Sequence, residues 1–184
     1  MAAPSSLYRF QIELSDVDRG VYRDLDFRIA KHPSENDDYL ITRVIAFALN
    51  QTDADDLEIA PGLCVDDQPA LYRKDPGGGY ELWIEIGNPA PRRIHKAAKA
   101  SRTVKIFTYK DPENLKREVQ AEGVHRQDEI EVFSLSTKFL KELASHLERD
   151  NRWGVIANDG EINISIGGES IAGTINPHRL TDRE

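Results

Sequence analysis

The chain has 184 residues, of which 39% are apolar and 30% charged, so we expect one hydrophobic core, a heavily solvated surface and a single domain over residues 1–184. Its formal net charge of −8 argues against unspecific coating of nucleic acid but leaves room for a local basic groove. No apolar stretch approaches the roughly 20 residues that cross a membrane, and no secretory leader pattern is present, so we expect a cytoplasmic monomer without membrane contact.

A β-hairpin and then a helix are predicted at the start of the chain. Alternating apolar and polar residues predict strands over residues 8–14 and 22–30, joined by a turn at 15–20. Ser34 is a good N-cap for the helix that follows, and Asp37 completes a capping-box pattern. Apolar residues then recur at helical spacing, which predicts one buried stripe.

The middle of the chain contains one ambiguous segment. After a short predicted strand at 57–60, residues 69–74 fit either one helical turn or the first arm of a hairpin. The Gly-rich stretch 75–79 is typical of a turn. Strict alternation over 80–87 predicts a strand in which Trp83 and Glu85 share one face.

Helices and strands alternate in the rest of the predicted chain before it changes to strands alone. The alternating elements are predicted over 91–101, 103–109, 112–121, 130–135 and 136–149, and the final strands over 153–157, 161–166 and 170–175. Asn158-Asp159-Gly160 is a strong hairpin signal. This order predicts an α/β (α+β) fold: a mixed sheet flanked by helices, with an additional antiparallel sheet from the N- and C-terminal strands.

Glu85 is the most informative candidate for a functional residue. It lies between Ile84 and Ile86 near the predicted strand end, where a carboxylate is costly unless a metal, a proton or a base pairs with it. If the hairpin is centred near Pro76, Asp67 faces Glu85 with Cβ atoms about 5 Å apart. Two carboxylates that close repel each other unless a cation such as Mg²⁺ lies between them, so both are candidate metal ligands.

Each acidic candidate also has a structural interpretation. Asp67 fits a helix cap. Glu85 fits a buried salt bridge, with Arg43 or Lys96 as the base. Glu35, which the prediction places in the first turn of its helix, fits a favourable interaction with the helix dipole.

The predicted helix over residues 91–101 is basic. Arg92, Lys96 and Lys99 fall on one side at i, i+4 and i+7, a face that is usually just solvated but that offers a local contact surface for nucleic acid. We expect Lys96 to reach back over the strand end, where it would orient a water or stabilise charge on a phosphate. His95 is the rival candidate for a general base. Arg92 and Lys99, together with Arg43 on the preceding helix, are the candidate substrate-binding cations.

The chain resembles the YaeQ family of bacterial proteins over essentially its whole length. The matching pieces include Pro33-Ser34-Glu35, Asp66-Asp67 with Pro69, Trp83-Ile84-Glu85-Ile86-Gly87 with Pro89, and Arg93-Ile94-His95-Lys96-Ala97. The Pro-Ser-Glu and Trp-Ile-Glu-Ile-Gly pieces are the specific ones. That family looks like a variant of the PD-(D/E)xK, or restriction-endonuclease-like, superfamily, whose members cut phosphodiester bonds with Mg²⁺. The resemblance implies that Glu35 matches the helix acid, Asp67 the Asp and Glu85 the strand acid.

Two positions depart from the superfamily and family patterns. Gly87 stands where the resemblance would place the catalytic Lys, so Lys96 would have to supply the cation. Gln68 stands where the family has Glu. We therefore carry two hypotheses: a Mg²⁺-dependent nuclease or phosphodiesterase, and a non-catalytic relative that retains the fold as a binding or regulatory module.

Overall fold

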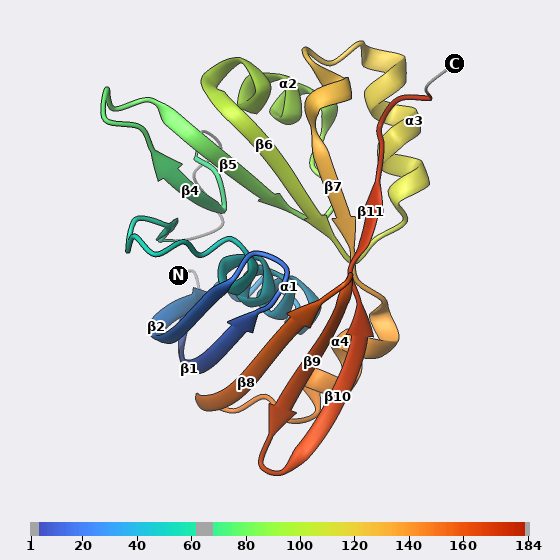
Figure 1. The fold of residues 1–184 in the computed structure, drawn as a ribbon. Coiled ribbons are helices and arrows are strands. Elements are labelled where there is room, and N and C mark those ends of the chain that lie inside the picture. Colours follow the sequence, from blue (N-terminus) through green and yellow to red (C-terminus); the bar gives the residue numbers. More distant parts are fainter. Residues whose placement is uncertain (1–3, 62–67, 183–184) are drawn as a thin grey trace.

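Two β-sheets and four helices make up the described part of the protein, and Figure 1 shows how they are arranged. The computed structural model describes residues 4–61 and 68–182. The mixed α/β architecture, with helices flanking the sheets, is the one that the alternation of predicted elements indicates. Among the described residues, no helix combines the length and the apolar composition that a membrane span requires.

The first sheet joins the two ends of the chain. Its strand order is β10-β9-β8-β1-β2, with bounds β1 Ser6–Asp16, β2 Val21–Lys31, β8 Asp150–Asn158, β9 Glu161–Ile166 and β10 Glu169–Thr174. The predicted pairing of terminal strands is confirmed, but β1 and β8 run parallel, so this five-stranded sheet is mixed rather than purely antiparallel. The reason is the path of the chain, because β8 enters the sheet at the end where β1 begins.

The second sheet has six strands in the order β11-β7-β6-β5-β4-β3. The bounds are β3 Glu58–Ile59, β4 Leu71–Lys74, β5 Tyr80–Ile86, β6 Ser101–Thr108, β7 Glu131–Ser134 and β11 Asn176–His178. Strands β5, β6 and β7 are parallel, and helices make the crossovers between them. β4 pairs antiparallel with β5, which confirms the hairpin alternative for residues 69–74.

Three of the helices complete the packing of the sheet faces. α1 (Asp37–Leu49) packs in a core that contains residues of both sheets. α2 (Pro91–Ala100) and α3 (Pro112–Glu122) cover the other face of the six-stranded sheet, where Trp83 packs in a second core with Ile94 and Val119. The two faces of β5 therefore belong to different cores.

Helix α4 (Thr137–Ala144) packs against the five-stranded sheet through Phe139. A Cβ atom added to Gly173 on β10 would lie 2.6 Å from the Phe139 ring, so the helix approaches the bare backbone of that strand. Ser136 is the N-cap of α4, as predicted. The helix ends at Ala144 rather than near residue 149, because the Asn151 amide accepts from the Glu148 N–H and holds the following segment in a turn.

The start of α1 differs from the sequence prediction. Its N-cap is Asn36, whose side chain accepts a hydrogen bond from the Tyr39 N–H at 2.8 Å. The Ser34 hydroxyl, the predicted cap, is instead 2.7 Å from His32 Nδ1. Glu35 consequently precedes the helix and does not lie in its first turn.

Candidate functional site

Glu85 is a buried carboxylate with two hydrogen-bond donors. The alternation of β5 turns Trp83 and Glu85 toward the face covered by α2, and Glu85 is 4% exposed. Its Oε1 accepts from Trp83 Nε1 at 2.7 Å and from Arg93 Nε at 2.8 Å. Burial raises the pKa of Glu85, and the Arg93 guanidinium and the Trp83 indole oppose that rise because both stabilise the charged form.

Arg93 is the base that pairs with Glu85, and the sequence interpretation missed it. It lies in the first turn of α2, which Pro91 starts directly after the end of β5. Its Nη2 also donates to the Gln68 carbonyl at 2.6 Å. The pair therefore joins the end of β5, the start of α2 and the segment before β4. The available signal was proximity, since Arg93 follows Glu85 by only eight residues.

Glu35 forms a second buried pair, this one with Arg43 of α1. The Glu35 side chain is fully buried, and Arg43 Nη2 lies 3.6 Å from its Oε2. Neither carboxylate oxygen has a hydrogen-bond partner of good geometry among the described residues. Burial raises the pKa of Glu35, and the charge of Arg43 opposes the rise. Arg43 also donates to the Ala30 carbonyl, so the expected pairing of Arg43 with Glu85 is wrong.

Tyr39 connects the two pairs electrostatically. The Arg43 guanidinium lies 5.7 Å from the centre of its ring. Burial raises the pKa of Tyr39 to about 12; Glu35 and Glu85 add to the rise, whereas Arg43 and Arg93 counter it. Both carboxylates therefore affect the ionisation of the Tyr39 phenol, although Glu35 lies just before α1 and Glu85 lies on the sheet face covered by α2.

Gly87 has a backbone reason to be glycine. Its φ of +83° lies in the left-handed region, where side chains are strained, and its N–H donates to the Phe107 carbonyl at 2.8 Å. An added Cβ would lie 3.9 Å from Tyr109 Cε1, so space alone does not exclude a side chain. The position at which the resemblance would place a catalytic Lys is thus a turn that disfavours one.

Helix α2 presents the basic face that the sequence predicts. It contains four Arg or Lys residues and no Asp or Glu. Arg92, Lys96 and Lys99 are exposed, on the side away from the buried Ile94. His95 Nδ1 instead accepts from the His125 N–H at 3.1 Å, so this nitrogen makes a structural contact and is not held toward Glu85.

The expected metal site rests on residues only partly described. Asp67, the other expected ligand, lies outside the described residues. The observed register pairs Leu71 with Ile84, which centres the hairpin between residues 77 and 78 rather than near 76 and brings Ala70 level with Glu85. The predicted hairpin centre near Pro76 is therefore wrong, whereas the role of Asp67 as a metal ligand stays a prediction.

The described donors do not by themselves fit Mg²⁺. Residues 4–61 and 68–182 contain no group of three His, Cys, Asp or Glu that would hold a metal ion. At Glu85, Mg²⁺ would compete with the Arg93 guanidinium for Oε1. At Glu35, the carboxylate already faces the Arg43 guanidinium, which would compete with a metal ion.

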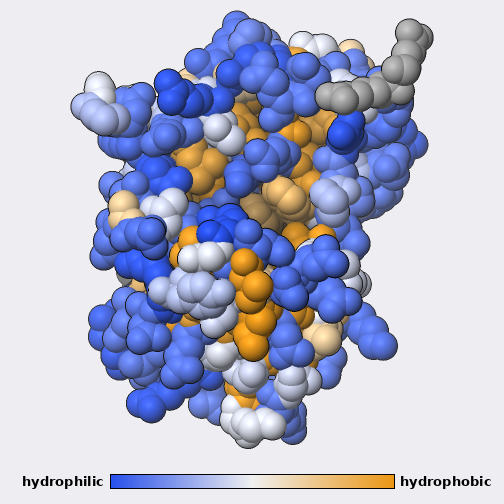
Figure 2. All heavy atoms as spheres, in the orientation of Figure 1, coloured by the Kyte–Doolittle hydropathy of each residue, from blue (hydrophilic) through white to orange (hydrophobic). Residues whose placement is uncertain are grey.

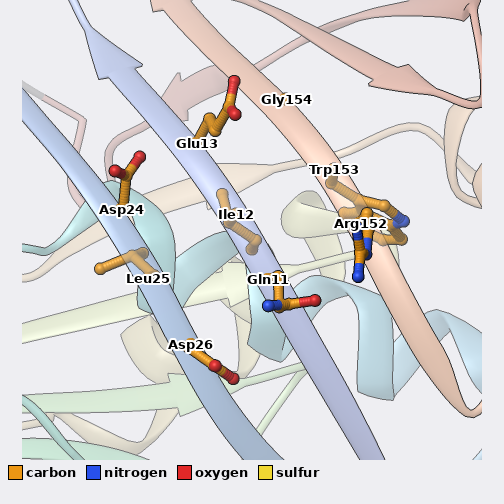
Figure 3. A pocket seen from close by; sticks show the side chains of 9 residues that line it. All are labelled: Gln11, Ile12, Glu13, Asp24, Leu25, Asp26, Arg152, Trp153 and Gly154. Atoms are coloured by element: carbon orange, nitrogen blue, oxygen red, sulfur yellow. The ribbon is translucent and has the colours of Figure 1, made fainter.

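The surface also has a depression that is remote from Glu85. It lies on the five-stranded sheet over Gly154, and Figure 3 shows Glu13 and Asp24 beside it on neighbouring strands. Glu13 and Asp24 are direct cross-strand neighbours. Because both are exposed, water screens their repulsion, and this open patch does not extend the Glu85 site.

Comparison with known proteins places the chain in a family. The family model described as "YaeQ protein" matches residues 1–175. Proteins named "Uncharacterized protein YaeQ" from Escherichia coli (strain K12) and Salmonella typhi are 36% and 32% identical over 109 residues. That stretch is 59% of this chain and 59% of each relative, so the alignment spans well under two thirds of their length.

Two solved structures extend the likeness over nearly the whole chain. The crystal structure of YaeQ protein from Xanthomonas axonopodis pv. citri has a TM-score of 0.86 at 32% identity and covers 96% of this chain and 99% of that one. The YaeQ structure from Pseudomonas syringae has a TM-score of 0.85 at 25% identity and covers 99% of both chains.

The fold and the site together define a class: a mixed α/β protein of two sheets with one buried acid–arginine pair at the end of β5 and another beside α1. Within that class, the chain belongs to the YaeQ family.

Proposed function

We propose that this protein is a nuclease-like binding module that contacts the phosphate backbone of nucleic acid through α2. In this proposal, Glu85 positions the helix through Arg93 and does not hold a catalytic metal. The observation that carries the proposal is the 2.8 Å pair between Arg93 Nε and Glu85 Oε1. It gives the buried acid the base it needs and fixes the start of the basic helix.

The charge of α2 supports a polyanionic partner. The chain carries a net charge of −8, yet this helix has four cationic residues and no acidic one. A local basic surface on an acidic protein attracts phosphates at short range while the rest of the molecule repels them, which limits unspecific coating. The exposed cations Arg92 and Lys99 lie two turns apart and can contact phosphates without disturbing Glu85.

Fluorescence anisotropy tests this proposal. Labelled single- and double-stranded DNA and RNA of about 20 nucleotides are titrated with protein between about 50 and 200 mM KCl. If three cations each neutralise one phosphate of a duplex, affinity falls roughly 40-fold over that range of salt. Reversing the charge of Arg92 and Lys99 should lower affinity at least about tenfold and flatten the salt dependence.

The matched control reverses two exposed cations elsewhere, Arg117 on α3 and Lys138 on α4. It makes the same change in net charge, so an effect of total charge alone would appear in both double variants. Equal losses in the two, or no saturable binding at low salt, would refute α2 as the contact surface.

A catalytic role is the second candidate function, and the spacing on α2 favours it. Arg93 contacts the strand-end acid, and Lys96 follows it by three residues, which places the two side chains on neighbouring positions of the helix surface. An ammonium group there would be positioned to stabilise charge on a phosphate bound at the end of β5. Lys96 would then supply the cation that the superfamily pattern has as a Lys at the position of Gly87.

Cleavage assays separate the two candidates. Single- and double-stranded DNA and RNA are incubated with the protein and Mg²⁺ or Mn²⁺, alongside Glu85→Gln and Lys96→Met. Cleavage that both variants abolish would establish the catalytic function and overturn the purely binding role. Saturable binding without cleavage under any of these conditions supports the proposed module.

A further inference from the structure

A hollow between the two sheets is not used by the proposed function. Its volume is about 290 Å³, and it lies where the β1–β2 and β8–β9 turns approach β6, β7 and the C-terminal end of α1. Figure 2 shows hydrophobic residues gathered in the hollow between the upper and lower sheets. Such a preformed concave space with a few polar groups is what small-molecule sites have in common.

The floor of this hollow is aromatic and aliphatic. Phe107 on β6 and Phe133 on β7 are stacked, with ring centres 5.1 Å apart and an interplanar angle of 28°. Leu49 and Ile175 line the hollow beside them and are only partly buried. The floor therefore offers apolar contact area for one flat ring.

The walls are held in place by hydrogen bonds between distant parts of the chain. Both oxygens of Asp18 lie 2.9 Å from the backbone nitrogen of Asp159, which ties the two turns together. Arg19 donates to Asp16 at 2.7 Å and to the Gln51 carbonyl at 2.8 Å, which ties the first turn to the end of α1. Because these walls are already ordered, binding of a ligand would cost little free energy for ordering side chains and turns.

The rim has unbalanced negative charge. Arg19 is neutralised by Asp16, and Lys105 lies 3.6 Å from Glu131. Within the described part of the chain, Asp18 accepts from a neutral backbone N–H and forms no ion pair, and the exposed Glu161 forms none either. The two uncompensated carboxylates favour a ligand that brings a positive charge to the rim.

We propose that this hollow binds a small amphiphilic cation, a planar aromatic ring that carries an ammonium group. The ring lies against Phe107 and Phe133, and the ammonium group lies at the rim beside Asp18 and Glu161. This site is separate from α2 and from Glu85, so its occupation does not depend on the proposed nucleic-acid contact.

A matched pair of probes tests both halves of the proposal. Tryptamine and indole-3-acetate share one ring system and carry opposite charges near neutral pH. Each is titrated into ¹⁵N-labelled protein up to about 5 mM, and amide shifts are followed at Asn50, Lys105 and Ile175. About twelve heavy atoms at modest efficiency predict a Kd of about 0.1–1 mM for tryptamine. The carboxylate analogue should bind at least about tenfold more weakly.

Charge reversal at the rim gives a readout that loss of folding cannot imitate. Glu161→Lys should weaken tryptamine at least about fivefold and strengthen indole-3-acetate, whereas the control Glu118→Lys on α3 should leave both unchanged. Leu49→Trp, which fills the floor, should abolish binding of both probes. No binding of either probe by the native protein, equal binding of the two, or a preference that Glu161→Lys leaves unaltered would each overturn the proposal.

Discussion

Replacing Arg93 by Met tests the buried pair at the end of β5. The change removes the guanidinium while it keeps much of the aliphatic bulk. Among the described residues, the Trp83 indole then remains as the one hydrogen-bond donor to Glu85 Oε1. Breaking a fully buried ion pair by removing one partner costs about 3–5 kcal/mol. The Arg93 side chain is 29% exposed, so water screens part of the interaction. We therefore expect a loss of about 2–3 kcal/mol at neutral pH.

The loss should depend on pH in a defined direction. Burial already raises the pKa of Glu85 above its unfolded value, so this group's contribution to the free energy of unfolding falls as pH rises through the folded pKa. Without Arg93 the folded pKa rises further, because the charged carboxylate loses its base. The difference between Arg93→Met and the native protein should therefore be larger near pH 8 than near pH 5.

Urea denaturation at the two pH values measures this difference, and thermal unfolding should show a fall in Tm of about 4–12 °C near neutral pH.

Arg92→Met is the matched control, because Arg92 is exposed on the same turn and its replacement should change the free energy of unfolding by no more than about 0.5 kcal/mol. In a Glu85→Gln background, Arg93→Met should cost less by about 1–2 kcal/mol. Equal penalties for the two arginine variants, or a penalty that does not change with pH, would refute the reasoning.

Three further changes test other contacts. Gly173→Ala should lower the free energy of unfolding by about 1–3 kcal/mol in urea titrations, because the added Cβ would lie 2.6 Å from the Phe139 ring. In the control Gly154→Ala the nearest side-chain atom is 3.6 Å away, so the free energy of unfolding should change by no more than about 0.5 kcal/mol. Gly87→Lys should cost about 1–2 kcal/mol through strain at a φ of +83°, and a thermal melt that matches the native one would contradict this. In an ultraviolet titration, Tyr39→Phe should remove one phenol that ionises near pH 12, and loss of a phenol that titrates near 10 would show that Tyr39 is not buried as described.

The elements whose burial pattern has a clear period were predictable from sequence. Strict alternation over β5 was enough to place Trp83 and Glu85 on one face, because the two-residue period of a strand allows no other arrangement. The Asn158-Asp159-Gly160 turn was predictable for a similar reason, since its residues favour the positive φ that Asp159 and Gly160 adopt.

Features set by the register and path of the chain were not predictable. The β4–β5 register includes an irregularity between Arg73 and Lys74 that no local sequence pattern predicts, and the hairpin centre lies beyond the expected Pro76. The choice of Arg93 as the base depends on the angle at which α2 leaves the sheet. Asn36 rather than Ser34 caps α1, because the Ser34 hydroxyl contacts the His32 ring instead. Residue spacing alone does not show which of these two polar side chains is the cap.

The parallel pairing of β1 with β8 has a consequence for how the chain acquires its shape. Arg9 lies beside Asp150 in that ladder, so during synthesis β1 has no partner on this edge until the much later strand β8 has been made. Until then, the N-terminal hairpin carries an unpaired edge on the ribosome, open to strands of other nascent chains. Such distant closure is intrinsically slow, so a chain truncated before residue 150 should aggregate rather than accumulate as a soluble intermediate.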